Sequence, residues 1–193
     1  MKSTSQIRII AGSLKGRRLA SPDWPGLRPT SDRLRETLFN VLADTVVGAR
    51  VLDGFAGTGA VGIEAISRGA AHVTFVDSDP RALDLIAQNL ARCGVTGGYT
   101  VLRADLIAAG LSGLPAAFDL VFLDPPYTMA PGEAITTAAP AIALRGRLVI
   151  EHARRSVPAG SLAGIELTRT LRAGDSALSF YRHDAVQAES ARA

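Results

Sequence analysis

The residues best suited to bind a nucleotide lie in a glycine-rich segment that carries Gly57, Gly59 and Gly62. Glycine at the first two positions lets the backbone turn tightly and approach a ligand, and Gly62 lets a following helix pack close to a strand. Asp77 lies about 20 positions after Gly57, where a dinucleotide-binding loop has an acid for the ribose hydroxyls. Asp53, just before the loop, disfavours a pyrophosphate because both groups carry negative charge. The segment therefore indicates a ligand with hydroxyl groups and positive charge.

S-Adenosylmethionine (SAM) has both features, and the spacing Asp53-x-x-x-Gly57-x-Gly59 resembles the first motif of class I SAM-dependent methyltransferases. A nicotinamide site is the alternative, and we favour the methyl donor because of Asp53. The resemblance implies that Asp77 holds the ribose hydroxyls, Asp105 the adenine N6, and Asp53 the methionine moiety, directly or through water. The predicted donor-binding residues are Asp53, Phe55, Ala56, Gly57, Thr58, Gly59, Asp77, Ser78, Asp105, Leu106 and Asp124.

The most specific segment is Asp124-Pro125-Pro126-Tyr127, which follows the apolar run 118–123. It resembles the fourth motif, (Asp/Asn/Ser)-Pro-Pro-(Tyr/Phe), of methyltransferases that act on an amine conjugated to a planar ring. Such a nitrogen is a poor nucleophile because its lone pair is delocalised. A carboxylate and a backbone carbonyl that accept its two N–H bonds can pull it towards tetrahedral geometry. Proline suits this role because its fixed φ holds the Pro125 carbonyl in place, and Asp124 can stabilise positive charge developing on the nitrogen.

Tyr127 is expected to stack on a flipped base, which contributes about 1–3 kcal/mol per base in other systems. That contribution offsets much of the few kcal/mol needed to unstack the target. The alternative is a tight turn with a packed tyrosine, and we favour catalysis because the motif follows an apolar strand and a glycine-rich loop. The predicted catalytic residues are Asp124, Pro125, Pro126 and Tyr127.

Strands and helices alternate from residue 50 onward, which predicts an α/β, Rossmann-like fold. The sheet is expected to be mostly parallel with seven strands, the last two forming an antiparallel hairpin at 165–172 and 177–182. The other expected strands are 51–53, 72–77, 99–103, 118–123 and 147–151. The expected helices are 59–68, 80–92 and 131–141, and a short segment at 105–113 connects two of the strands.

Acidic residues follow four successive strands of this predicted sheet. They are Asp53, Asp77, Asp105 and Asp124. Ligands bind at the carboxyl ends of strands in such a sheet, so these side chains are expected to surround one site. Any single one could instead cap a helix, as we expect of Asp79 before Pro80.

The N-terminal part is expected to form a basic β-hairpin from strands 7–10 and 17–20, followed by a helix from Thr30 or Ser31 to Ala43. We divide the chain into an N-terminal extension (1–45) packed on the core, a methyltransferase core (46–184) and a flexible tail (185–193).

Basic charge is concentrated in residues 1–35, which hold eight Lys or Arg against two Asp, whereas the whole chain carries a net charge of +3. A solvated surface is the alternative, but together with a methyl-donor site the charge favours a nucleic-acid partner. Arg33 or Arg35 could instead pair with Glu36 or Asp32. The predicted RNA contacts are Arg8, Lys15, Arg17, Arg18, Arg28, Thr30, Arg33 and Arg35.

Composition excludes several other classes of protein. A hydrophobic fraction of 47% excludes a disordered chain. No apolar run reaches the roughly 18–20 residues that span a membrane, and residues 1–6 lead into no signal-peptide core. The three histidines have no metal-ligand spacing, and the lone Cys93 cannot form an internal disulfide. We expect a cytoplasmic monomer that binds neither membrane nor metal.

The segments 8–12, 15–19, 27–40, 52–60 and 124–127 together resemble the small bacterial 16S rRNA (guanine(966)-N(2))-methyltransferases. The resemblance covers roughly residues 7–183, with 27–40 its most family-specific part. It implies methyl transfer from SAM to a guanine exocyclic amine in 16S rRNA, with the assembled or partly assembled small ribosomal subunit as partner. Gly54 and the turn at 170–176 depart from the family pattern, which leaves the role of the C-terminal hairpin open.

Three other functions compete with this one. A DNA adenine-N6 methyltransferase shares the Asp-Pro-Pro-Tyr segment but ordinarily needs a recognition domain. A protein-glutamine methyltransferase should carry Asn at position 124. The third is a non-catalytic, SAM-responsive RNA-binding or ribosome-assembly factor, and the presence of Asp53, Asp124 and Tyr127 together disfavours it.

Overall fold

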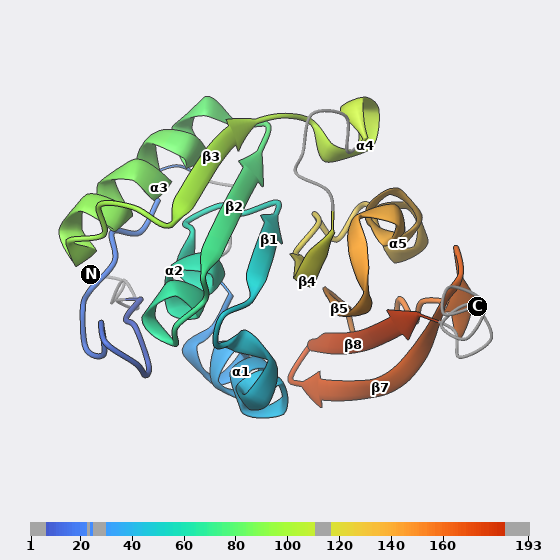
Figure 1. Cartoon of the computed structure of the whole chain (residues 1–193). Helices are drawn as coiled ribbons and strands as arrows, with labels where there is room; N and C mark the ends of the chain where they lie inside the picture. The colour runs from blue at the N-terminus through green and yellow to red at the C-terminus, as the bar shows by residue number, and fades with distance from the viewer. Residues whose placement is uncertain (1–6, 23, 25–29, 111–116, 184–193) are drawn as a thin grey trace.

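The computed structural model describes residues 7–22, 24, 30–110 and 117–183. Within these residues one eight-stranded sheet has the order β3-β2-β1-β4-β5-β8-β7-β6 (Figure 1). The strands are β1 (Arg50–Gly54), β2 (His72–Asp77), β3 (Tyr99–Arg103), β4 (Phe118–Leu123), β5 (Ile142–Ala153), β6 (Ser161–Leu162), β7 (Ile165–Ala173) and β8 (Ser176–His183). The helices are α1 (Asp32–Val46), α2 (Ala60–Ser67), α3 (Pro80–Cys93), α4 (Leu106–Ala109), α5 (Pro131–Ala138) and the 3₁₀ helix η1 (Ala139–Ala141).

The predicted α/β class is confirmed. β1 to β5 pair in parallel, and β8, β7 and β6 extend the sheet in antiparallel fashion. The predicted count of seven strands was wrong, because β6 adds an eighth. With only two residues, β6 is too short to produce the alternation of apolar and polar side chains that identifies a strand.

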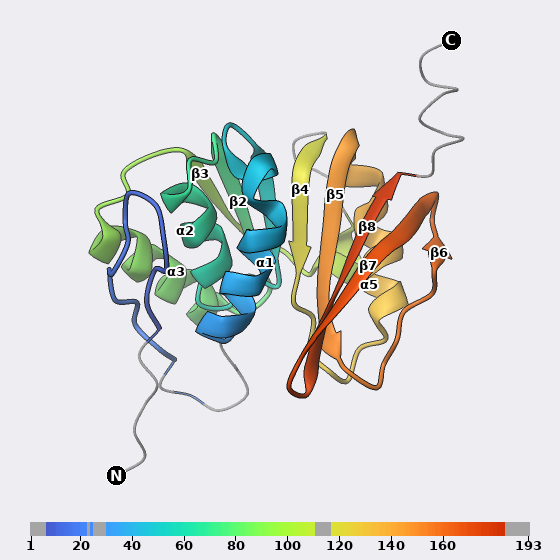
Figure 2. The same ribbon diagram turned by 90° about the horizontal axis from the view of Figure 1, so that it is seen from below.

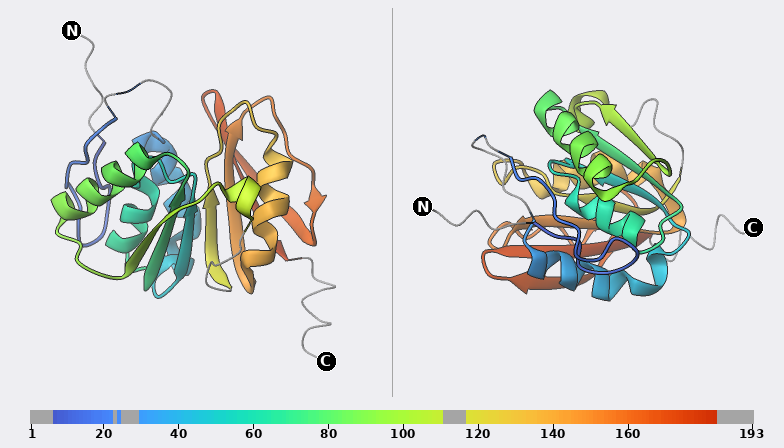
Figure 3. Two further views of the ribbon diagram at one scale, coloured as in Figure 1. Left: turned by 90° about the horizontal axis from the view of Figure 1, so that it is seen from above. Right: turned by 90° about the vertical axis from the view of Figure 1, so that its left-hand side faces the viewer.

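Helices cover both faces of the sheet, as Figures 2 and 3 show. α1, α2 and α3 bury apolar side chains in one hydrophobic cluster, while α4 and α5 contribute to a second cluster on the other face. β1 and β4 are buried along almost their whole length, as expected for strands covered on both sides.

Capping residues define both ends of α3. The predicted cap Asp79 accepts a hydrogen bond from Arg81 N, and α3 ends at Gly94 with φ 71°.

The N-terminal hairpin has fewer paired residues than the two strands predicted from the sequence. Arg8 and Arg18 form a single antiparallel bridge, supported by hydrogen bonds from Ile9 N to Arg17 O and from Leu19 N to Ile7 O. Ile7, Ile9 and Leu19 are nevertheless buried in the same hydrophobic cluster as α1 and α2. The hairpin therefore packs into the core through its apolar side chains, with little strand pairing of its own.

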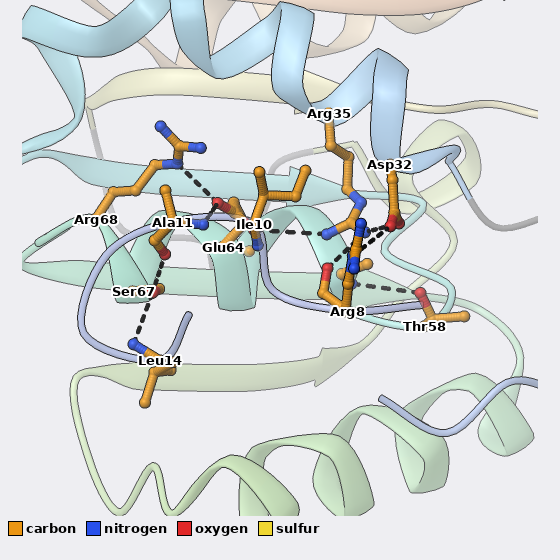
Figure 4. A network of polar contacts seen from close by, with 12 residues as sticks. Arg8, Ile10, Ala11, Leu14, Asp32, Arg35, Thr58, Glu64, Ser67 and Arg68 are labelled. Carbon is orange, nitrogen blue, oxygen red and sulfur yellow. Dashed lines mark hydrogen bonds and ion pairs between the residues drawn. The ribbon is translucent and has the colours of Figure 1, made fainter. Parts of the chain in front are cut away.

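A buried carboxylate on α2 fixes this hairpin to the core (Figure 4). Glu64 is fully buried and accepts hydrogen bonds from Ile10 N (2.7 Å) and Ala11 N (3.0 Å). It also forms ion pairs with Arg68 (2.8 Å) and Arg35 (3.6 Å). We call Glu64, Arg35, Arg68 and the two backbone amides the Glu64 network.

Arg35 extends the same network to the start of α1. Its guanidinium lies 2.6 Å from an Asp32 carboxylate oxygen and donates to Arg8 O at 2.9 Å. The side chain has no exposed surface, so the prediction that Arg35 contacts RNA was wrong. Pairing with Asp32, the alternative left open by the sequence, is what the structure contains. The physical reason is that a buried arginine must be neutralised by acidic partners.

Candidate active site

A cavity of about 630 Å³ opens at the carboxyl ends of the parallel strands. This volume is typical of sites for small ligands. Its walls come from the start of α1, the loop after β1, the ends of β2, β4 and β5, and the turn between β7 and β8. Segments that lie far apart in the sequence therefore meet at the edge of the sheet where the sequence predicted a site.

The loop between β1 and α2 forms one side of this cavity. Phe55, Gly57 and Gly59 have positive φ values of 60°, 54° and 72°, a conformation that costs a non-glycine residue energy. Gly57 N donates to an Asp77 carboxylate oxygen at 2.8 Å, and the other oxygen of that carboxylate accepts from Asp79 N at 2.9 Å. Asp77 therefore holds the loop in shape from the neighbouring strand.

Gly62 is required for close packing, as the sequence predicted. A Cβ atom at this position would lie 2.2 Å from Phe75 Cε1 and 2.9 Å from Val73 Cγ1. Because both neighbours belong to β2, any larger side chain would push α2 away from the sheet and shift the loop that α2 follows.

Asp53 is a buried acid in the wall of the cavity. Its carboxyl group accepts a hydrogen bond from Gly62 N at 2.8 Å and has almost no exposed surface. The pKa of Asp53 is raised to about 8, mainly because burial disfavours the charged form; the Gly62 N–H lowers it and the negative charge of Asp77 raises it. A cation bound beside this group would favour its ionised form.

The opposite side of the cavity contains the Asp124-Pro125-Pro126-Tyr127 segment. Asp124 N donates to Gly54 O at 3.3 Å, which continues the pairing of β4 with β1 by one residue. Thr30 Oγ1 donates to an Asp124 carboxylate oxygen at 3.0 Å. The hydroxyl of Thr30, which we predicted to contact RNA, therefore orients the predicted catalytic carboxylate.

Tyr127 lies at the rim with 44% of its surface exposed. Its hydroxyl is 2.6 Å from Ser176 Oγ and donates to Glu151 Oε1 at 3.3 Å. These contacts fix the end of the side chain while part of the ring stays open to a ligand. The residues of the β7–β8 turn that line the cavity are Ala173, Gly174, Asp175 and Ser176.

Sequence reasoning missed Glu151 and Ser176. Glu151 stands at the end of the predicted strand 147–151, so the strand-end rule that found the four aspartates could have found it. Nothing in the sequence places Ser176 here, because its position depends on the packing of the whole hairpin. The other lining residues outside our predicted set are Ser31, Leu34, Ala60, Val61, Phe122, Thr128, Ala173, Gly174 and Asp175.

Three predicted donor-binding residues do not line the cavity. Gly59 precedes α2 as its cap, and Leu106 is buried in the core. Asp105 is exposed and caps α4 by accepting from Ile107 N at 3.0 Å and Ala108 N at 3.1 Å. The other predicted donor-binding residues all line the cavity: Asp53, Phe55, Ala56, Gly57, Thr58, Asp77, Ser78 and Asp124.

The predicted RNA contacts differ in accessibility. Lys15, Arg17, Arg18 and Arg33 are exposed, and Arg8 is exposed although it lies 3.4 Å from Asp32. Arg28 lies outside the described residues.

In the described part of the chain, no three acidic, histidine or cysteine side chains gather as metal ligands, and no helix is long and apolar enough to cross a membrane.

Comparisons with known proteins agree with this architecture. Ribosomal RNA small subunit methyltransferase D of Escherichia coli is 45% identical over 124 residues, which span 64% of this chain and 62% of that protein. A putative rRNA methyltransferase of Bacillus subtilis is 34% identical over 181 residues, or 91% of this chain and 98% of the relative. A solved structure of a putative methyltransferase from Escherichia coli superposes with a TM-score of 0.81 at 34% identity, covering 93% of this chain and 99% of that one.

The family described as conserved hypothetical protein 95 matches residues 7–182. The match includes the hairpin, α1, the loop after β1 and the Asp124 segment. Because it covers most of the chain, this protein belongs to the conserved hypothetical protein 95 family.

Proposed function

We propose that this protein transfers a methyl group from SAM to the exocyclic N2 amine of a guanine in 16S rRNA. One observation carries the proposal. The Asp124-Pro125-Pro126-Tyr127 segment shares a cavity with the glycine-rich loop because β4 is the direct neighbour of β1. A segment suited to hold an aromatic amine thus faces a segment suited to hold a nucleoside with positive charge.

We call the part of the cavity formed by Asp53, the loop after β1 and Asp77 the donor side, and the part formed by Thr30, Asp124–Tyr127 and the β7–β8 turn the acceptor side. The donor side fits SAM in both charge and size. A nearby cation would stabilise the ionised form of the buried Asp53 carboxyl group. The Asp77 carboxylate accepts two backbone N–H bonds and keeps further lone pairs that can accept from ribose hydroxyls. Phe55, Ala56 and Thr58 line the same cavity. When bound, SAM supplies an electrophilic methyl group on a positively charged sulfur.

The acceptor side is proposed to orient the amine and the base. The Asp124 carboxylate and the Pro125 carbonyl accept the two N–H bonds of the amine, and Thr30 fixes the rotation of the carboxylate. Tyr127 stacks on the flipped base from the rim. No separate base is required, because the methylated amine loses its proton readily.

The substrate is inferred from charge and from relatives. Lys15, Arg17, Arg18 and Arg33 offer exposed positive charge for phosphates, which gives affinity but no sequence information. The Escherichia coli relative is named as a small-subunit rRNA methyltransferase. We therefore infer that the small ribosomal subunit is the partner. That the protein is a cytoplasmic monomer stays a prediction from the sequence.

Transfer of labelled methyl from SAM into small subunits, free 16S rRNA and duplex DNA tests the proposal. We expect label in subunit rRNA that digests to N2-methylguanosine and is lost in Asp124→Ala. Asp84→Ala, which removes an exposed carboxylate from α3, is the matched control and should keep the activity. Label in DNA adenine, or none despite SAM binding, would overturn the proposal.

A further inference from the structure

A buried carboxylate, that of Glu151, stands beside the partly buried Asp124 at the edge of the sheet. Leu123 of β4 is paired in parallel with Ile150 of β5, so Asp124 and Glu151 follow at the same level on neighbouring strands. Neighbouring strands lie about 4.8 Å apart. Glu151 is only 6% exposed, and both carboxylates line the same cavity. Two hydrogen-bond acceptors therefore lie side by side where the proposed function puts the target base.

Glu151 also contacts the proposed stacking residue. The hydroxyl of Tyr127 donates to Glu151 Oε1 at 3.3 Å and lies 2.6 Å from Ser176 Oγ. A base held by Asp124 and stacked on Tyr127 would therefore have the Glu151 carboxyl group within its immediate surroundings. This position is the one from which a side chain can read the edge of the base.

Guanine matches two adjacent carboxylates better than any other base. Its Watson–Crick edge carries two neighbouring donors, the N1–H and the N2 amine, both of which a carboxylate can accept. Adenine has an acceptor at N1, and cytosine has an acceptor at N3. Either base would bring a lone pair against a buried acceptor, which is unfavourable because the acceptor then loses its hydrogen bond.

We propose that Glu151 determines the base specificity of this protein by accepting the N1–H of the target guanine while Asp124 holds the N2 amine. The proposal rests on the proposed methylation of guanine N2. It assigns to the end of β5 a role separate from catalysis, because N1 is not the atom that receives the methyl group.

The test uses 2-aminopurine, which keeps the 2-amine of guanine but has an acceptor in place of the N1–H. Small-subunit rRNA is ligated around a synthetic segment that carries guanine or 2-aminopurine at the methylated position, which is first mapped with labelled methyl. Single-turnover transfer is then measured on both RNAs. We expect the unaltered protein to favour guanine by about 10–100-fold, the effect of one hydrogen bond to a charged group.

Glu151→Gln should bring this ratio close to one, because a glutamine amide can either accept from guanine N1–H or donate to 2-aminopurine N1. Tyr127→Phe removes only the hydroxyl that touches Glu151 and should lower transfer without changing the ratio. Glu166→Gln is the matched control. It makes the same change in an exposed ion pair between Glu166 of β7 and Arg182, and it should leave both rates unchanged. Thermal unfolding verifies that each variant is folded.

The outcomes separate this inference from the proposed function. If Glu151 only positions Tyr127, Glu151→Gln lowers both rates equally and the ratio persists, which overturns the inference. Equal transfer to both RNAs by the unaltered protein overturns it as well and leaves the methylation of guanine N2 standing. No transfer to the guanine RNA overturns the proposed function and the inference with it.

Discussion

The donor side and the acceptor side of the cavity are built in different ways. The donor side comes from one continuous strand, loop and helix held by two carboxylates, with Gly62 N bound to Asp53 and Gly57 N bound to Asp77. The acceptor side joins distant segments. Thr30 and Asp124 are 94 positions apart, and Tyr127 and Ser176 are 49 positions apart.

This difference means that the two sides depend on different parts of the fold. The donor side is complete once β1, α2 and β2 have packed together. The acceptor side additionally needs the N-terminal segment and the β7–β8 hairpin in place. Changes in those outer elements should therefore reduce methyl transfer more than they reduce SAM binding.

The largest expected effect is on stability, at the point where the N-terminal hairpin is fixed to the donor-side helix. Glu64→Ala leaves Arg35 buried without one of its acidic partners and removes the acceptor for Ile10 N and Ala11 N. Breaking a buried ion pair costs about 3–5 kcal/mol, so the free energy of unfolding in urea should fall by about that amount. Glu36→Ala, an exposed change on α1, is the control. A loss below about 0.5 kcal/mol, as for ordinary surface changes, would show that the network does not fix the hairpin.

Gly62→Ala should damage the donor side alone. The added Cβ would lie 2.2 Å from Phe75 Cε1, and overpacking of this kind costs about 1–3 kcal/mol. SAM affinity should fall together with stability, as measured by calorimetry and urea unfolding. Gly97→Ala has no atom within 4 Å of the new Cβ and should change neither. Normal SAM affinity in Gly62→Ala would contradict a rigid donor loop.

Asp53 gives the donor side a dependence on pH. Its pKa in the fold is about 8, against an ordinary value of 3.8, so between these values the unfolded chain ionises while the folded protein keeps the proton. Stability therefore falls as pH rises from about 4 to 8, by at most about 1.4 kcal/mol per pH unit from this group. Asp53→Asn should remove this slope in unfolding experiments, and an unchanged slope would argue against a protonated Asp53.

The same group links SAM binding to a proton. A cation favours ionised Asp53, so SAM should bind more tightly as pH rises towards 8 and should release a proton on binding. Calorimetry in two buffers with different ionisation enthalpies measures this release directly. Asp53→Asn should release none.

The smallest expected effect concerns the acceptor side alone. Thr30→Val removes the hydroxyl that donates to Asp124, and one net hydrogen bond of about 1 kcal/mol corresponds to a loss of roughly fivefold in transfer. SAM affinity should not change. Thr37→Val, on α1 outside the cavity lining, is the control and should preserve transfer. An equal loss of SAM affinity and transfer in Thr30→Val would contradict the claim that the two sides of the cavity have separate roles.

The sequence identified most of the residues that form the loop side of the cavity, because their signals are local. Asp53, the glycine positions and Asp77 are identified by spacing along one strand, loop and helix, and Asp79 by its place before a proline. Strand bounds such as Phe118–Leu123 follow from apolar runs, which in this strand only the exposed Asp119 interrupts.

The acceptor side could be predicted only in part, because packing between distant segments decides it. Asp124 and Tyr127 belong to a recognisable motif, whereas Ser176 reaches Tyr127 only through the fold of the hairpin. Arg35 follows the same logic. Its residue type suggests a surface position, but Glu64 on another helix stabilises it in the interior. Contacts of this kind leave no pattern in the neighbouring sequence.

The most direct test of the account measures SAM affinity and single-turnover methyl transfer to small ribosomal subunits in the same preparation of Asp124→Ala. If the two sides of the cavity have separate roles, transfer falls by about 10²–10³-fold, as for loss of a preorganised electrostatic contact. Asp124 is also a predicted donor contact, but SAM affinity should stay within about threefold, since the donor loop is held by Asp53 and Asp77. Transfer at the original rate, or a loss of SAM affinity as large as the loss of transfer, would contradict the account.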